Sequence, residues 1–173
     1  MKARHWALAA ALAFALTGPA AAAGWRHLGD AGQVERRADG VVVRSGPARL
    51  QVSVHADGVF RVRMAPDGRL DGDASWAVVQ GAQAPHVAID ETGDAIRVRG
   101  NGVTAVVHRS RLRVDFVDGD GRALLADDAA LPMAWLPGEH GTRVRVWKSM
   151  PADEHYYGLG DKAGPLDRRG RAF

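Results

Sequence analysis

Apolar residues recur at every second position in several short segments of this chain, and this alternation constrains the fold more than any other feature. Between Ala48 and His55, the apolar residues Leu50, Val52 and Val54 alternate with polar ones. A period of two places successive side chains on opposite faces of a β-strand, so one face can pack while the other stays in water. The segment is therefore predicted to be a half-buried strand.

Turn-forming residues separate the alternating segments. Asp57-Gly58 stands between the segment 48–55 and a second one at 59–64, and an Asp-Gly pair tolerates the positive φ that a tight β-hairpin demands. A hairpin is therefore predicted here. The same pattern predicts further strands at 41–44, 77–79, 87–89, 96–99, 103–108, 111–116 and 143–147, with turns at 101–102 and 118–121, or about eight or nine strands in all.

Helices are not expected. No window of a dozen residues shows apolar spacing at three and four, and 21 glycines and 8 prolines interrupt the chain. The predicted fold class is all-β, a two-sheet antiparallel β-sandwich. Arginines dominate the outward strand positions, where their stems cover sheet surface while the guanidinium groups stay in water. Because the chain has no cysteine, disulfides and thiolate chemistry are excluded, and a packed core must supply the stability.

The first 23 residues are predicted to be a secretory signal peptide rather than structure. Lys2 and Arg4 make a positive start, residues 6–16 are apolar, and Ala21 to Ala23 fit an A-x-A cleavage pattern. An apolar run this short does not span a bilayer, so no stable membrane anchor is expected after cleavage. The predicted organisation is a signal peptide at 1–23, a sandwich at 24–155 and a motif segment at 156–173, with the protein periplasmic or secreted.

The charge does not indicate a nucleic-acid partner. The chain has 23 basic and 20 acidic residues, a formal charge of +3, and removal of Lys2 and Arg4 leaves 21 basic residues and +1. A nucleic-acid-binding domain normally carries a clear basic surface. No nucleic-acid partner is therefore predicted.

Familiar catalytic and metal-binding motifs are missing from the sequence. The seven histidines include no pair at helical metal-ligand spacing, and there is neither H-E-x-x-H nor G-x-S-x-G. Asp118 and Asp120 are interpreted as a hairpin turn rather than a calcium loop. The acidic pairs at 127–128 and 153–154 are interpreted as solvated loops rather than glycosidase carboxylates. No catalytic residue, metal site or cofactor is predicted in this chain.

The most specific signal is the segment E-H-Y-Y-G-L-G-D-K-A-G-P-L-D-R-R-G at 154–170. It resembles a motif of glycoside hydrolase family 31, the α-glucosidases and α-xylosidases, approximately F/Y-Y/F-G-L-G-E-K-x-G-x-L-D-R-R-G. The positions that can be compared are Tyr156, Tyr157, Gly158, Leu159, Gly160, Asp161, Lys162, Gly164, Leu166, Asp167, Arg168, Arg169 and Gly170, and all but one agree. The one departure is Asp161, where the family more often has Glu.

The residues of the motif also suggest a local structure. Tyr156 and Tyr157 are predicted to begin a strand with one ring in the core, and Gly158 and Gly160 to adopt positive φ or allow close backbone approach. Asp167 is expected to fix the following loop by bonding to its arginines. The loop either docks one domain on the next or contacts sugar, with Asp161 and Asp167 as the candidate acceptors for sugar hydroxyls.

Tryptophans offer a second kind of sugar contact. Trp76, Trp135 and Trp147 could stack on a sugar face, but an aromatic residue in a sandwich is more often part of the core. A core position is therefore the favoured prediction for each of them.

The resemblance implies a galactose-mutarotase-like N-terminal domain of a retaining α-glycosidase. In that family the Asp nucleophile and the Asp acid/base lie on a (β/α)8 barrel that follows the sandwich. This chain is therefore expected to be the inactive N-terminal piece of an exported enzyme, whose partners are that barrel and, through the full-length enzyme, an α-linked glucoside or oligosaccharide. Two alternatives remain: a stand-alone periplasmic sandwich that binds carbohydrate or protein without catalysis, and an orphan domain with an uncovered apolar surface.

Overall fold

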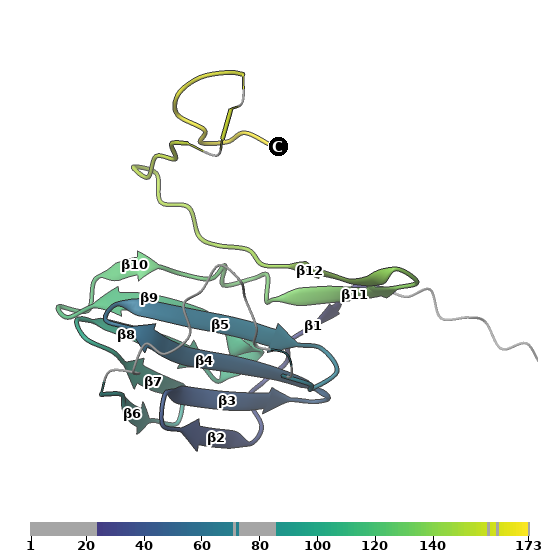
Figure 1. The fold of residues 1–173 in the computed structure, drawn as a ribbon, viewed down its shortest axis with the longest axis vertical. Coiled ribbons are helices and arrows are strands. Elements are labelled where there is room, and N and C mark those ends of the chain that lie inside the picture. The colour runs from purple at the N-terminus through teal and green to yellow at the C-terminus, as the bar shows by residue number, and fades with distance from the viewer. Residues whose placement is uncertain (1–23, 71, 73–85, 159, 162, 173) are drawn as a thin grey trace, which may run out of the picture.

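The computed structural model describes residues 24–70, 72, 86–158, 160–161 and 163–172, and this part of the chain is almost entirely antiparallel β-structure (Figure 1). Its elements are β1 (Arg26–His27), β2 (Val34–Arg37), β3 (Gly40–Ser45), β4 (Ala48–Ala56), β5 (Val59–Ala65), β6 (Ala88–Glu91), β7 (Ala95–Arg99), β8 (Val103–His108), the 3-10 turn η1 (Ser110–Leu112), β9 (Val114–Asp118), β10 (Ala123–Leu125), β11 (Ala134–Gly138) and β12 (Gly141–Arg145). The predicted strand at 77–79 and the predicted signal peptide lie outside the described residues. Among the residues described, no helix has the length and apolar character needed to cross a membrane.

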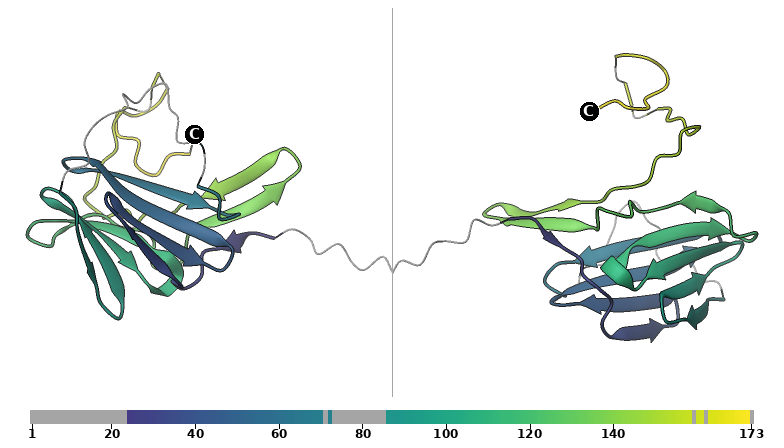
Figure 2. Two further views of the ribbon diagram at one scale, coloured as in Figure 1. Left: turned by 60° about the horizontal axis from the view of Figure 1, so that its bottom comes forward. Right: turned by 180° about the vertical axis from the view of Figure 1, so that it is seen from behind.

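Two sheets form the sandwich. A four-stranded sheet has the order β2-β3-β4-β5, and a five-stranded sheet has the order β10-β9-β8-β7-β6. They lie face to face, as the two views of Figure 2 show. Phe60 of β5 meets Phe116 of β9 edge to face, with ring centroids 5.4 Å apart. The predicted sandwich is therefore present in the fold.

The core lies between these sheets and follows the alternation in the sequence. Leu50, Val52 and Val54 of β4 are at most 2% exposed. From the opposite sheet, Ile96, Val98, Ala105, Val107 and Val114 join the same cluster. Apolar burial on this scale is the main favourable contribution to folding.

The predicted hairpins are confirmed. Strands β4 and β5 pair antiparallel, and Gly58 between them has a φ of +69°. Strands β7 and β8 pair in the same way around Asn101 and Gly102, and Gly102 has a φ of +75°. Both turns place glycine in the left-handed region that other residues avoid.

An ion-pair cluster joins the edges of the two large sheets. Glu91 of β6 accepts hydrogen bonds from Arg36 of β2 at 2.8 Å and from Arg109 at 2.7 Å. The Arg36 hydrogen bond is the largest cause of the lowered pKa of Glu91, and Arg109 adds to it. The cluster therefore links β2 to β6 across one open side of the sandwich.

A third sheet departs from the predicted two-sheet arrangement. It has the order β1-β11-β12, with Arg26 of β1 opposite Trp135 of β11. This sheet lies beside the sandwich in Figure 1, and every residue of β12 is exposed. It forms because β11 pairs with a short strand near the start of the described chain instead of extending a larger sheet.

The predicted strand at 111–116 begins later than expected. Ser110–Leu112 form a 3-10 turn with Arg111 at φ 58°, and β9 starts at Val114. The backbone N–H of Arg111 donates to Asp30 at 2.9 Å, which holds the turn. Leu112 is nevertheless fully buried. The apolar side chain of Leu112 is therefore buried as predicted, although it enters the core from a 3-10 turn and not from a strand.

Candidate functional site

The motif segment forms an irregular loop that extends away from the sandwich beyond β12 (Figure 1). The predicted strand at Tyr156 and Tyr157 is wrong, because the chain has left the sheets at this point and the described residues provide no neighbouring strand. Tyr156 is half-buried and the side chain of Tyr157 is 62% exposed. The ring of Tyr157 stacks loosely on His155, with centroids 6.3 Å apart.

Asp167 closes this loop. One carboxylate oxygen lies 2.6 Å from Nδ1 of His155. The other oxygen accepts the backbone N–H of Tyr156 at 3.3 Å and that of Arg169 at 3.0 Å. The His155 hydrogen bond is the main reason why the pKa of Asp167 falls to about 2, with help from the Arg169 N–H. The carboxylate is therefore ionised at neutral pH and committed to holding two chain segments together.

The arginines that follow reinforce the closure by bonding to backbone. The guanidinium of Arg169 donates to the carbonyl oxygens of Pro151 at 2.6 Å and Glu154 at 2.5 Å. The backbone N–H of Arg168 donates to the carbonyl of Tyr156 at 2.7 Å. Asp167 itself meets Arg169 through the backbone N–H. The expected self-fixing loop is present, and backbone groups supply much of its bonding.

The predicted positive φ of the motif glycines is confirmed at Gly158, with φ +90°, and at Gly160, with φ +80°. Gly164 has a φ of +126°, and a Cβ there would approach the Arg168 guanidinium to 3.3 Å. Leu166 is 77% exposed, and Gly170 is exposed as well. Leu159 and Lys162 lie outside the described residues.

The two candidate sugar acceptors differ in their surroundings. Asp161 is exposed on the loop, and none of the described residues bonds to its carboxylate. Asp167 already accepts three hydrogen bonds within the loop. The loop therefore leaves the carboxylate of Asp161 more open to an external hydroxyl.

The structure describes two of the three tryptophans considered as sugar contacts, Trp135 and Trp147. Trp135 is 5% exposed and belongs to the core cluster, so the core position predicted for it is confirmed. Trp147 is half-buried, and Trp76 lies outside the described residues.

A buried carboxylate anchors the chain where it leaves for the loop, and sequence reasoning missed it. Asp127 was expected in a solvated loop, but it is 4% exposed. One of its oxygens accepts the backbone N–H of Val114 at 2.8 Å, and the other pairs with the Lys148 ammonium group. Its own N–H donates to Asp115, which lies 2.7 Å from His108. Burial of Asp127 is possible because each of its oxygens has a partner.

The neighbouring acidic residues behave as the sequence predicts. Asp128 is half-exposed and caps the backbone N–H groups of Ala130 and Leu131. Asp118 accepts the N–H groups of Asp120 and Arg122, which confirms a turn at this position. Within the described ranges, no group of three or more His, Cys, Asp or Glu side chains could hold a metal ion.

Comparison with known proteins identifies the family. A family profile described as the glycosyl hydrolase 31 N-terminal galactose mutarotase-like domain matches residues 49–173. The chain belongs to this family.

Curated and solved relatives agree with the glycosyl hydrolase 31 assignment. Alpha-glucosidase 2 of Bacillus thermoamyloliquefaciens is 27% identical over 124 residues, which are 72% of this chain and 15% of that protein. The GH31 alpha-xylosidase of Xanthomonas citri superposes with a TM-score of 0.68 at 29% identity, over 80% of this chain and 16% of that one. The GH31 dextranase of Flavobacterium johnsoniae, solved with isomaltotriose, has the same fold, with a TM-score of 0.71, 21% identity and coverage of 84% and 18%. The glycosyl hydrolase 31 chain described here thus spans less than a fifth of the length of each of these relatives.

Proposed function

We propose that this chain is the non-catalytic N-terminal domain of an exported retaining α-glycosidase that acts on α-linked glucosides or oligosaccharides. In this proposal, residues 1–23 direct export, and a (β/α)8 barrel following the sandwich carries the catalytic carboxylates. The domain supports that barrel and carries the loop at 154–172 towards it. The family match over residues 49–173 is the observation that carries the proposal.

The distribution of exposed apolar side chains supports a docked barrel. Among the described residues, nearly all the large apolar side chains that stay exposed lie between 124 and 166. They are Leu124, Leu125, Leu131, Val144, Val146, Met150, Tyr157 and Leu166. Strands β10 and β12 and the loop lie along the same side of the molecule in Figure 1 and in the right-hand view of Figure 2. In this proposal the barrel covers the exposed apolar side chains that these elements carry.

The loop is suited to a supporting role because its shape depends on its own bonds. Asp167 and Arg169 close it, which leaves Tyr157, Asp161 and Leu166 exposed on its surface. In this proposal Leu166 and Tyr157 contact the barrel, and Asp161 accepts a hydrogen bond from a sugar hydroxyl. Asp167 holds the loop in shape for that contact.

The first experiment is to sequence the gene beyond codon 173. An open frame that encodes a barrel with Asp residues at strand ends supports the proposal. A stop codon would instead favour a stand-alone binding sandwich.

The second experiment tests whether the chain alone has hydrolase activity. The purified chain is expected to leave an aryl α-glucoside unhydrolysed, whereas the chain together with its barrel releases the aryl group. Turnover by the chain alone would contradict the non-catalytic role. Asp161→Asn in the longer protein should raise KM, with Asp153→Asn as a control on an exposed acid before the motif.

A further inference from the structure

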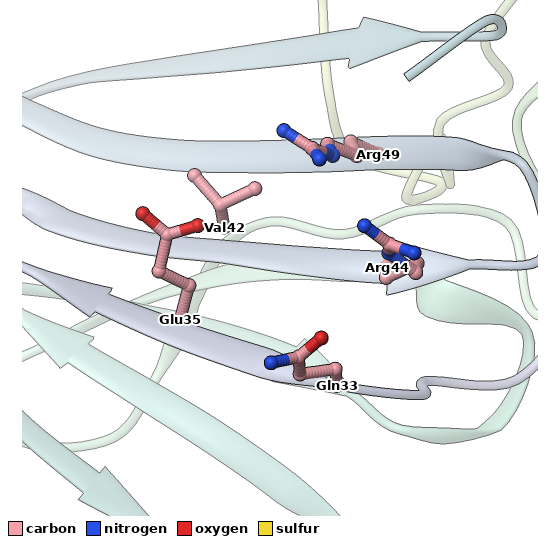
Figure 3. Close-up of a pocket in the computed structure, with 5 residues that line it drawn as sticks. All are labelled: Gln33, Glu35, Val42, Arg44 and Arg49. Carbon is pink, nitrogen blue, oxygen red and sulfur yellow. The ribbon is translucent and has the colours of Figure 1, made fainter.

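A small pocket on the outer face of the four-stranded sheet lies among side chains that the proposed function does not use. It is lined by Gln33, Glu35, Val42, Arg44 and Arg49, from β2 and the residue before it and from β3 and β4 (Figure 3). The motif loop is far along the chain and leaves the sandwich elsewhere (Figure 1). The pocket is therefore a separate feature of the molecule.

Two arginines without acidic partners form one wall of the pocket. Arg44 of β3 and Arg49 of β4 are directly opposite each other in the antiparallel register, so both side chains lie on the same face. In the described part of the chain, neither guanidinium makes a hydrogen bond or an ion pair. Like charges directly opposite each other on a sheet are unfavourable. An anion between them would remove that repulsion.

The backbone of Arg44 and the stem of Arg49 are held by their surroundings. Arg44 donates its N–H to the carbonyl of Gln33 at 2.9 Å and accepts the N–H of Gly32 at 2.7 Å. The stem of Arg49 lies over Gly68, where a Cβ would come within 3.9 Å of its Cγ. A guanidinium presents a planar fork that matches a carboxylate with two parallel hydrogen bonds.

The remaining lining residues suit a hydroxylated ligand. In Figure 3 the carboxamide of Gln33 lies beside Arg44 and the carboxylate of Glu35 lies next to Val42, and both Gln33 and Glu35 are exposed. Arg37 donates to Glu35 at 3.1 Å, which partly balances its charge. Val42 lies at the floor of the pocket but is only 3% exposed, so the polar side chains supply the contacts to a ligand. Amide and carboxylate groups bond well to hydroxyls.

We propose that this pocket binds a saccharide that carries a carboxylate group. Arg44 and Arg49 hold the carboxylate, and Gln33 and Glu35 bond to hydroxyls of the sugar ring. This binding is independent of the proposed glycosidase function, because it uses neither the motif loop nor a barrel.

The test is a titration of the purified chain with sodium glucuronate, followed by the NMR signals of the arginine Nε–H groups. The signals of Arg44 and Arg49 are expected to shift and saturate, and the shift should weaken at high salt. Glucose should bind about tenfold or more weakly, because it lacks the charged hydrogen bonds. Arg44→Gln and Arg49→Gln should each weaken glucuronate binding by about tenfold or more.

The matched control is Arg122→Gln, which changes an arginine whose side chain is 78% exposed and which pairs with Asp120 in a turn of the other sheet. This variant should bind glucuronate unchanged, and retained amide spectra establish that each variant is folded. Absence of a saturable shift overturns the proposal, as does equal binding of glucose and glucuronate. Equal binding of inorganic phosphate and glucuronate also overturns it, since the hydroxyl contacts would then contribute nothing.

Discussion

The imidazole of His155 and the carboxylate of Asp167, twelve residues apart in the sequence, lie 2.6 Å from each other and close the loop between them. The same carboxylate also accepts two backbone N–H groups, from Tyr156 and Arg169. One side chain thus joins the two ends of the motif. The loop obtains a defined shape outside the sheets, where strand pairing cannot supply one.

The pKa of Asp167 should depend on His155. In the intact loop it is about 2, below the ordinary value of 3.8, because His155 and backbone N–H groups stabilise the ionised form. A lowered folded-state pKa means that the carboxylate stabilises the loop fully above about pH 4 and loses this effect as the pH falls through about 2. His155→Ala should move the pKa towards 3.8, as measured by the carboxyl carbon shift during a pH titration.

Asp94 is an internal control in the same titration. Its pKa is lowered mainly by a hydrogen bond from Thr92, and His155 is not among its causes. The His155→Ala substitution should leave Asp94 unchanged. An unchanged Asp167 would show that the His155 contact does not govern its ionisation.

Asp127→Ala should destabilise the fold strongly. The substitution leaves the buried N–H of Val114 without its acceptor and Lys148 without its anion, at a cost of about 2–4 kcal/mol. Asp128→Ala, at the half-exposed neighbour, removes only a loop cap and should cost about 1 kcal/mol. Urea unfolding of the two variants measures the difference, and equal losses would contradict the anchoring role of Asp127.

Truncation of two leucines should change the free energy of unfolding by very different amounts. Leu50 is fully buried in the core, so Leu50→Ala should lower the free energy of unfolding by about 2–5 kcal/mol. Leu166 is 77% exposed on the loop, and Leu166→Ala should change it by less than about 0.5 kcal/mol. Thermal or urea unfolding compares them directly. A large loss for Leu166→Ala would mean that the loop contributes to the core.

Gly40→Ala should be among the most damaging small substitutions. A Cβ at this position would lie 2.0 Å from the carbonyl oxygen of Val52, so the β3–β4 pairing would have to separate locally. We expect a loss of about 3 kcal/mol or more in unfolding free energy, at the upper end for an overpacked site. Gly93→Ala meets no atom within 4 Å and should be close to neutral. A soluble Gly40→Ala variant with unchanged stability would contradict the close approach.

Local sequence patterns predicted the strands and turns whose structure depends on residues nearby in the sequence. Alternation located β4 and β5, and Asp57-Gly58 located the turn between them. The family assignment was also available from sequence, because the motif residues at 154–170 are specific in both type and order.

The errors concern partners that lie far away along the chain. Arg26 pairs with Trp135 in the third sheet, and alternation says which residues share a face but not which strand lies beside them. Asp127 is buried because Val114 and Lys148, from 13 and 21 residues away, both reach its carboxylate. Tyr156 has strand-like neighbours in sequence, but the described residues place no strand beside it, so its local propensity was overridden.

The isolated bridge between Asp127 and Lys148 has a mechanical consequence for the loop. Beside it, Asp128 bonds to the carbonyl of Trp147 and Ser149 to that of Ala126, and beyond this point the chain runs out to the loop. These few bonds attach the chain to the sandwich just before it leaves for the loop after Ser149. Because Asp127 also accepts the N–H of Val114, the first residue of β9, a force applied to the loop would be transmitted to that strand. The exit of the loop is thus tied to a core strand, so a load on the loop would be borne by the buried sandwich and not by the exposed strand β12 alone.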